Sequence, residues 1–199
     1  RARFAWGLAR AREAGLRPAH RHLAATAATL TDPLAHHTMS RVGAGLVGID
    51  PSGTLVGDAA LAGALELTAP VVAVRAVRAG TGVGYGHTHR TTRATHLALL
   101  PVGYADGLPR AASGRAEVLL RGRRRPVVGR ISMDQLVVDV GDGADGGVPE
   151  PGEQAVLMGA GHRGEPTVGE WAAWSGSLPH EVVTGFGQDG PYAGRAGYD

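Results

Sequence analysis

The sequence contains no lysine, because all twenty residues counted as Lys plus Arg are arginine. An enzyme that binds a carbonyl cofactor through an amine needs a lysine side chain, so this chain cannot supply that group itself. Cysteine is also absent, which excludes disulfide bonds and thiolate chemistry and fits a reducing compartment. We therefore expect a cytoplasmic protein whose own chemistry rests on other residue types.

Long hydrophobic runs are missing as well. Apolar stretches such as 70–74 and 97–102 are far shorter than the roughly 20 residues of a membrane-spanning helix, and the first residues do not resemble a signal peptide. The formal charge is only +2, so the high pI mainly records arginine in place of lysine and is weak support for nucleic-acid binding. We expect a globular chain with neither a membrane nor a nucleic acid as partner.

The pattern of apolar residues and turns changes near residue 60. Before it, helical spacing over 1–16 and strand-like segments at 20–26 and 38–49 predict α/β architecture. After it, valine-rich segments recur between glycine and proline turns and predict an all-β domain, a barrel or a sandwich, with one helix at 168–175. The predicted strands are 71–77, 96–102, 116–120, 127–131, 136–140 and 154–158.

Three motifs in this β region stand out by their order. They are Gly-Val-Gly-Tyr-Gly at 82–86, Val-Gly-Tyr-Ala-Asp-Gly at 102–107 and Val-Gly-Arg-Ile-Ser-Met-Asp-Gln at 128–135. Together with His-Leu-Ala-Ala-Thr at 22–26 and Arg-Val-Gly-Ala at 41–44, they resemble the alanine racemase family over most of the chain. The resemblance implies α/β plus all-β architecture, with the last units of a (β/α)8 barrel at 1–62 and a C-terminal β-barrel-like domain at 63–199.

The resemblance also implies an activity. Family members interconvert L-alanine and D-alanine by two-base proton transfer at the α-carbon, with pyridoxal 5'-phosphate (PLP) as cofactor, and form homodimers with shared active sites. Their cofactor lysine lies in the early barrel, which this chain does not contain, and the chain begins with Arg1 rather than Met. We therefore expect a C-terminal fragment that is inactive alone and prone to aggregate through exposed strand edges.

The cofactor phosphate is expected in the barrel part. Phosphate sites of such barrels form in the loops after strands seven and eight, where backbone amides face the anion. By resemblance Thr26 and the amides of Gly43 and Ala44 would hold the phosphate, although each residue alone also suits a helix cap or a turn. His180 stands where relatives carry a phosphate-binding tyrosine, and Ala25 and Thr26 replace the usual asparagine and serine.

Arg41 would face the pyridine nitrogen of the cofactor. A guanidinium keeps its protons, so it donates a hydrogen bond to that nitrogen without protonating it. The ring is then a weaker electron sink, which favours quick reprotonation of the α-carbon over transamination. Without the resemblance, Arg41 reads as an ordinary surface arginine.

Tyr85 would be the second base, on the face of the substrate opposite the lysine, and would reach into the partner subunit's barrel. A phenol has a reference pKa near 10, so neighbouring cations must lower it for this task. The alternative is a turn tyrosine between permissive glycines. A nucleotide-binding loop is a poor interpretation, because no hydrophobic helix follows Gly86.

Further site residues follow from the resemblance. Met133, through its backbone amide, and Asp134 would bind the carboxylate side of the substrate. Tyr104, Arg110 and Arg130 would shape the entrance, and their alternative role is that of solvated loop residues.

Two patterns suggest other functions. The arginine-rich segment 121–126 invites a nucleic-acid hypothesis, but it lies between two predicted strands and indicates a charged hairpin turn. His87 and His89 alternate, yet no acid or histidine cluster completes a metal site, so we predict none. A broad-specificity amino-acid racemase of the same fold, a natural truncated homologue and a non-catalytic β-barrel binding module remain as alternatives.

Overall fold

The computed structural model describes residues 1–53, 61–144 and 146–186. The chain divides into two compact units, Arg1–Ala62 and Gly63–Asp199. In the described part, no helix combines the length and apolar character needed to cross a membrane.

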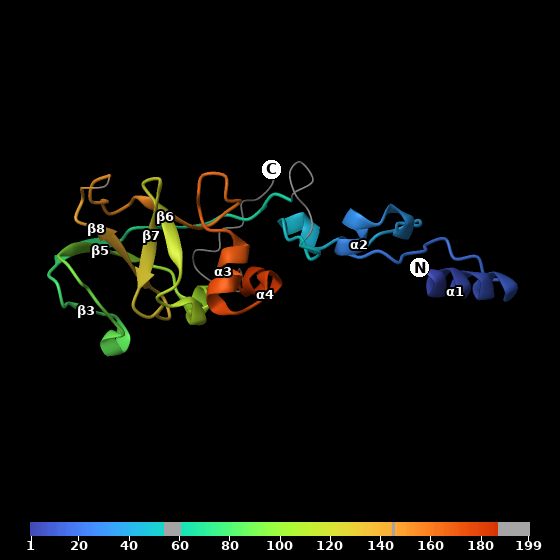
Figure 1. The fold of residues 1–199 in the computed structure, drawn as a ribbon, viewed down its shortest axis with the longest axis horizontal. Helices are drawn as coiled ribbons and strands as arrows, with labels where there is room; N and C mark the ends of the chain where they lie inside the picture. The colour runs from blue at the N-terminus through green and yellow to red at the C-terminus, as the bar shows by residue number, and fades with distance from the viewer. Residues whose placement is uncertain (54–60, 145, 187–199) are drawn as a thin grey trace. The chain divides into compact units, whose positions relative to one another are not determined.

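The first unit is built from short helices and extended segments (Figure 1). Helix α1 spans Ala2–Glu13, with Arg10 and Arg12 in its last turn, where cations favour the carbonyl end of a helix. It ends three residues earlier than predicted. Helix α2 (Thr26–Thr31) and the 3-10 turns η1 (Pro33–Ala35) and η2 (Ala44–Val47) follow.

The predicted strand at 20–26 is wrong as a strand. Its one pairing in the described residues is an isolated parallel bridge between Ala25 and Arg41, and Arg41 N–H donates to the carbonyl of Ala24 at 3.0 Å. A strand requires a continued ladder with a neighbour. The backbone here meets its neighbour at a single point.

The second unit contains a seven-stranded sheet in which all neighbours are antiparallel. Its strand order is β1-β9-β6-β7-β8-β5-β2. The strands are β1 (Leu67–Pro70), β2 (Ala73–Val77), β5 (Thr95–Leu100), β6 (Glu117–Leu120), β7 (Arg123–Val128), β8 (Leu136–Gly141) and β9 (Gln154–Met158). A separate two-stranded hairpin joins β3 (Gly82–Val83) to β4 (His89–Arg90).

The two edges of the large sheet are β1 and β2, which are consecutive in the sequence. Only Val71 and Val72 separate them, and Val71 bonds toward β9, the neighbour of β1, whereas Val72 bonds to β5, the neighbour of β2. Val71 N–H donates to the carbonyl of Glu153 at 2.8 Å, and Val72 N–H donates to that of Leu99 at 2.9 Å. The sheet therefore curls back on itself, which confirms the barrel-like β domain expected from the sequence.

Side chains alternate along the strands, and those that point inward fill the inside of the curled sheet. In β8 every second residue from Leu136 is buried, as a strand with one face on a core requires. The fully buried side chains include Leu100, Val118, Val138 and Leu157. These come from β5, β6, β8 and β9, so the core sits within the curled sheet.

The arginine-rich segment lies in the hairpin between β6 and β7. Leu120 pairs with Arg123, so the turn consists of Arg121 and Gly122, both at positive φ. The hairpin is confirmed, but Arg123 and Arg124 belong to strand β7 rather than to the turn. Arg124 also forms an ion pair with Glu170 at 3.0 Å, which ties β7 to the following helix.

Helix α3 spans Val168–Ser175, as predicted. Its start is fixed by a capping box, in which Thr167 accepts from Glu170 N–H and the Glu170 carboxylate accepts from Thr167 N–H. Trp171 is fully buried and its indole N–H donates to the carbonyl of Leu157 at 2.6 Å. Helix α4 (Pro179–Gly185), which the sequence analysis did not predict, lies beside α3 (Figure 1).

Candidate functional site

The tip of the β3–β4 hairpin packs against the loop that follows β7. A Cβ built on Gly129 would lie 2.9 Å from the carbonyl oxygen of Val83, and one on Gly84 would lie 3.5 Å from the backbone nitrogen of Arg130. Gly129 also has a φ of 75°, which favours glycine. The structure thus brings two motifs, far apart in the sequence, into direct contact.

Tyr85 sits at the end of this hairpin, at the start of the 3-10 turn η4 (Tyr85–His87). Gly84 and Gly86 flank it with φ values of 64° and 70°, so the turn depends on both glycines. The Tyr85 side chain is 70% exposed. The guanidinium of Arg130 lies beside the same turn, 3.7 Å from where a Cβ of Gly86 would stand.

The Tyr104 motif packs against the other end of the same loop. Tyr104 N–H donates to the carbonyl of Ser132 at 3.0 Å, and Ala105 N–H donates to that of Met133 at 2.9 Å. Tyr104 opens the 3-10 turn η5 (Tyr104–Asp106) and is exposed, as are Met133 and Asp134. Loop 129–135 therefore contacts both the β3–β4 hairpin and turn η5, and all three segments carry exposed residues.

Arg110 approaches this loop through a serine. Ser113 accepts from Ile131 N–H at 3.0 Å and donates to the carbonyl of Arg110 at 2.6 Å. Arg110 begins the 3-10 turn η6 (Arg110–Ala112) and is exposed. All six residues expected at the substrate side thus lie on segments that meet at loop 129–135: Tyr85, Tyr104, Arg110, Arg130, Met133 and Asp134.

The residues expected at the cofactor form a second group, within the first unit. Thr26 is buried, and its hydroxyl oxygen accepts from Gly43 N–H at 3.2 Å. The bridge between Ala25 and Arg41 places Arg41 beside the residue that precedes Thr26. Ala44 starts turn η2. A hydroxyl and backbone amides that converge after two adjacent parallel segments suit a phosphate group.

His180 is exposed in the first turn of α4, in the second unit. This helix contacts the Tyr104 motif at its far end, because a Cβ on Gly107 would lie 2.2 Å from the carbonyl oxygen of Gly185. His87 and His89 have no partners for a metal, and the described residues contain no cluster of three or more His, Asp or Glu that could hold one.

Sequence reasoning missed the residues that hold the loops together. Gly103, Asp106 and Ser113 supply the close contacts and hydrogen bonds around loop 129–135. One signal was available, since Asp followed by Gly is typical of a turn closed by the carboxylate. Ser113 carries no such signature.

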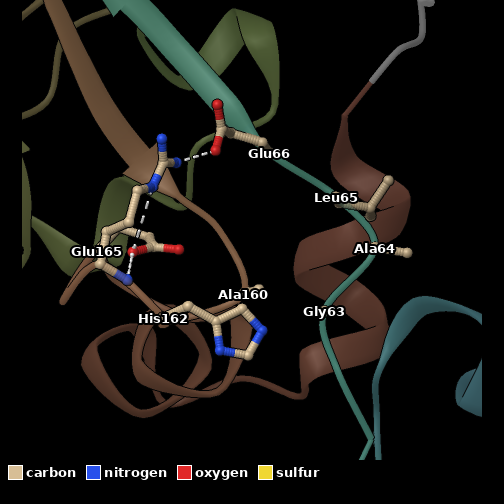
Figure 2. A pocket seen from close by; sticks show the side chains of 8 residues that line it. Gly63, Ala64, Leu65, Glu66, Ala160, His162 and Glu165 are labelled. Atoms are coloured by element: carbon tan, nitrogen blue, oxygen red, sulfur yellow. Dashed lines mark hydrogen bonds and ion pairs between the residues drawn. The ribbon is translucent and has the colours of Figure 1, made fainter.

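A cavity of about 310 Å³ lies elsewhere in the second unit (Figure 2). It is lined by residues 63–66 and by the loop between β9 and α3. Its charges are paired with each other, since Arg163 bonds to Glu66 and the buried Glu165 accepts from Gly161 N–H at 2.9 Å and Arg163 N–H at 2.8 Å. The buried carboxylate of Glu165 therefore stabilises the loop beside the cavity by accepting hydrogen bonds from its backbone.

Glu165 makes the stability of this loop pH-dependent. Burial opposes its ionisation, but hydrogen bonds from its own N–H and from those of Arg163 and Gly161, with the Arg163 charge, outweigh burial and lower the pKa of Glu165. A lowered carboxyl pKa stabilises the fold above the unfolded value and loses that effect as pH falls through the folded value. We expect Glu165→Gln to lower the free energy of unfolding at pH 7. Urea unfolding at a series of pH values should also show a smaller fall in this free energy toward acid pH in Glu165→Gln than in the wild type. Glu66→Gln, at an exposed position, is the matched control. An equal loss of unfolding free energy toward acid pH in the wild type and in Glu165→Gln would contradict this role.

The chain thus combines a first unit of short helices and extended segments with a curled β domain, whose loops carry a tyrosine, arginines and a Met-Asp pair. Comparison with known proteins gives the family. Residues 64–193 match the family model for the alanine racemase C-terminal domain, and residues 1–51 match that for the N-terminal domain. The chain belongs to the alanine racemase family.

Individual relatives agree. The alanine racemase of Streptomyces coelicolor is 46% identical over 191 residues, covering 95% of this chain and 48% of the relative, and that of Salinispora tropica is 46% identical over 92% of this chain and 48% of the relative. The solved S. coelicolor structure matches with a TM-score of 0.86 over 94% of this chain and 48% of its own. A Bartonella henselae alanine racemase with covalently bound pyridoxal phosphate matches with a TM-score of 0.76 at 30% identity, over 88% of this chain and 47% of its own. The chain thus spans about half the length of these relatives.

Proposed function

We propose that this chain is the C-terminal portion of an alanine racemase that uses PLP and interconverts L-alanine and D-alanine, the D-enantiomer being a peptidoglycan precursor. The observation that carries the proposal is the convergence of three segments at loop 129–135, which brings together the turns that carry the exposed residues Tyr85, Arg130 and Met133. The lysine that binds the cofactor would belong to the part of the whole protein that this chain lacks.

The residues of the first unit would hold the cofactor. Thr26 accepts a hydrogen bond from Gly43 N–H in this structure and keeps its own hydroxyl proton for a phosphate oxygen. The amides of Gly43 and Ala44 would be the further donors to the phosphate. Arg41 would donate to the pyridine nitrogen. When bound, PLP supplies the electron sink that makes the α-proton of alanine acidic.

The residues of the second unit would handle the substrate. Tyr85 would remove or return the α-proton on one face, with the lysine serving the other face. Met133 N–H and Asp134 would hold the carboxylate end, and Tyr104, Arg110 and Arg130 would line the approach. His180 would reach the phosphate in place of a tyrosine. The 70% exposure of Tyr85 is compatible with a site shared with the partner in a homodimer, because the phenol is accessible from outside its own unit.

The test is to co-produce the chain with the N-terminal half of the S. coelicolor relative. We expect an absorbance typical of pyridoxal in the purified complex and loss of the α-proton of alanine in heavy water. Exchange with larger amino acids at a similar rate would favour a broad-specificity racemase. A complex without pyridoxal absorbance and without exchange would overturn the proposal in favour of a binding module. A cytoplasmic location stays a prediction.

Arg41→Glu tests the role of the pyridine partner. A carboxylic acid shares a proton with the ring nitrogen and strengthens the electron sink, so we expect slower racemisation and a gain in transamination. Pyruvate and the amino form of the cofactor, measured after incubation with alanine, report the side reaction. Arg21→Glu in the same unit is the matched control. An Arg41→Glu enzyme that forms no more pyruvate than this control would show that Arg41 does not set the fate of the carbanion.

A further inference from the structure

The backbone of loop 131–135 is held from several sides. Ile131 N–H donates to Ser113, and Ser132 N–H donates to the carbonyl of Gln135 at 2.9 Å. The carbonyls of Ser132 and Met133 accept from the Tyr104 motif. Met133 N–H has no hydrogen-bond partner among the residues that the structure describes, and the same holds for the N–H groups of Asp134 and Gln135. A backbone donor without a partner in the protein is available to a ligand, and Met133 N–H is the one that the proposed function assigns to the substrate carboxylate.

The direction of this donor follows from the geometry of one peptide unit. The carbonyl of Ser132 and the N–H of Met133 share a trans peptide plane and point in opposite directions. The hydrogen bond from Tyr104 N–H to the Ser132 oxygen fixes that plane. Met133 N–H is therefore aimed away from turn η5, and the bond to Tyr104 determines where it points.

Turn η5 is in turn held by Asp106. The Oδ2 atom of Asp106 accepts from Gly103 N–H at 2.8 Å, and Asp106 N–H donates to the carbonyl of Gly103 at 3.2 Å. A Cβ on Gly103 would lie 2.3 Å from the carbonyl oxygens of both Ser132 and Met133. The turn and the loop are thus in contact at van der Waals distance, so a shift in one is passed to the other.

We propose that Asp106 is a positioning residue, which aims Met133 N–H at the carboxylate of the substrate through turn η5 and the 132–133 peptide plane. This inference rests on the proposed function, because it takes Met133 N–H as the carboxylate donor. Asp106 itself touches no substrate. Its effect is that of a preorganised donor, which costs nothing to orient when the substrate binds.

The geometry is tested by NMR amide exchange on the 199-residue chain co-produced with the N-terminal half of the S. coelicolor relative, with the isotope label in the 199-residue chain. Asp106→Ala removes the acceptor for Gly103 N–H, so we expect the amides of Tyr104 and Ala105 to exchange at least roughly tenfold faster. Asp106→Asn keeps an acceptor oxygen and should restore slow exchange. Asp142→Ala is the matched control, because Asp142 makes a similar bond to Ala144 N–H at 3.0 Å in another loop. Unchanged exchange at Tyr104 in Asp106→Ala would overturn the inference.

The functional consequence is tested in the whole racemase. We expect Asp106→Ala to lower kcat/KM for alanine about 10- to 100-fold, since a misplaced group of this kind has effects of that order. Competitive inhibition by acetate, a bare carboxylate, should weaken in parallel, while the pyridoxal absorbance stays and Asp106→Asn recovers most of both. A loss of activity with unchanged acetate inhibition would mean a merely structural role. A whole protein that does not exchange the α-proton at all would instead refute the proposed function.

Discussion

Replacing Tyr85 by phenylalanine is expected to abolish most proton exchange from L-alanine while it spares exchange from D-alanine. A positioned acid/base group contributes roughly 10²- to 10⁴-fold to a proton transfer, and each base of a two-base racemase serves one face. The change removes a single oxygen from a side chain that is 70% exposed. The fold should therefore be unaffected, and exchange into each enantiomer in heavy water measures the result.

Tyr104→Phe is the matched control for this experiment. It removes the same oxygen from an exposed tyrosine in a neighbouring loop, and an entrance residue should affect both enantiomers alike. Equal loss of exchange from L- and D-alanine in Tyr85→Phe would refute a face-specific role for Tyr85. Loss confined to D-alanine would mean that the two bases serve the opposite faces.

Trp171→Ala is expected to have the largest effect on stability. The indole is fully buried in the core of the second unit and packs edge-on against Trp174, with ring centres 5.6 Å apart. Truncation of a buried tryptophan costs about 3–5 kcal/mol. The substitution also leaves the carbonyl of Leu157 without the indole N–H that donates to it at 2.6 Å. Urea unfolding followed by near-ultraviolet circular dichroism measures the loss.

Trp6→Ala provides the control. Trp6 is 65% exposed on α1, where its ring lies 5.8 Å from the Arg10 guanidinium carbon. A substitution at such a surface position typically changes stability by about 0.5 kcal/mol or less. If Trp171→Ala and Trp6→Ala unfolded at the same urea concentration, α3 would not be part of the cooperative core.

Several elements could be predicted from the sequence because their signals are local. Helix α3 has a capping box at Thr167 and Glu170 and a left-handed Gly176 after it, and β9 is a compact apolar run between turns. Strand β7 was placed too late in the chain, because its first half is arginine, which carries no apolar pattern. Pairing with β6 across the turn at Arg121 and Gly122, rather than hydrophobicity, determines where it begins.

The site was only partly accessible from sequence for a similar reason. The motif residues could be named through the family resemblance, but their meeting point depends on close approaches between distant backbones. Gly103 against Met133 and Gly129 against Val83 are such contacts, and a glycine in a sequence does not say which backbone it faces. The untested roles of Tyr85, Arg41 and the phosphate residues stay predictions until the substitutions are made.

The closure of the sheet by β1 and β2 has a consequence for how the protein is made. Leu67 pairs with Met158, so β1 is synthesised long before the strand that covers its edge. Until β9 has left the ribosome, β1 presents an unpaired edge, and such edges invite pairing with other chains. The neighbouring strand β2, by contrast, finds β5 soon after synthesis. We expect the growing chain to assemble from β2 and β5 onward and to close the sheet at β1 only after β9 has been synthesised, before helix α3 adds Trp171 to the core.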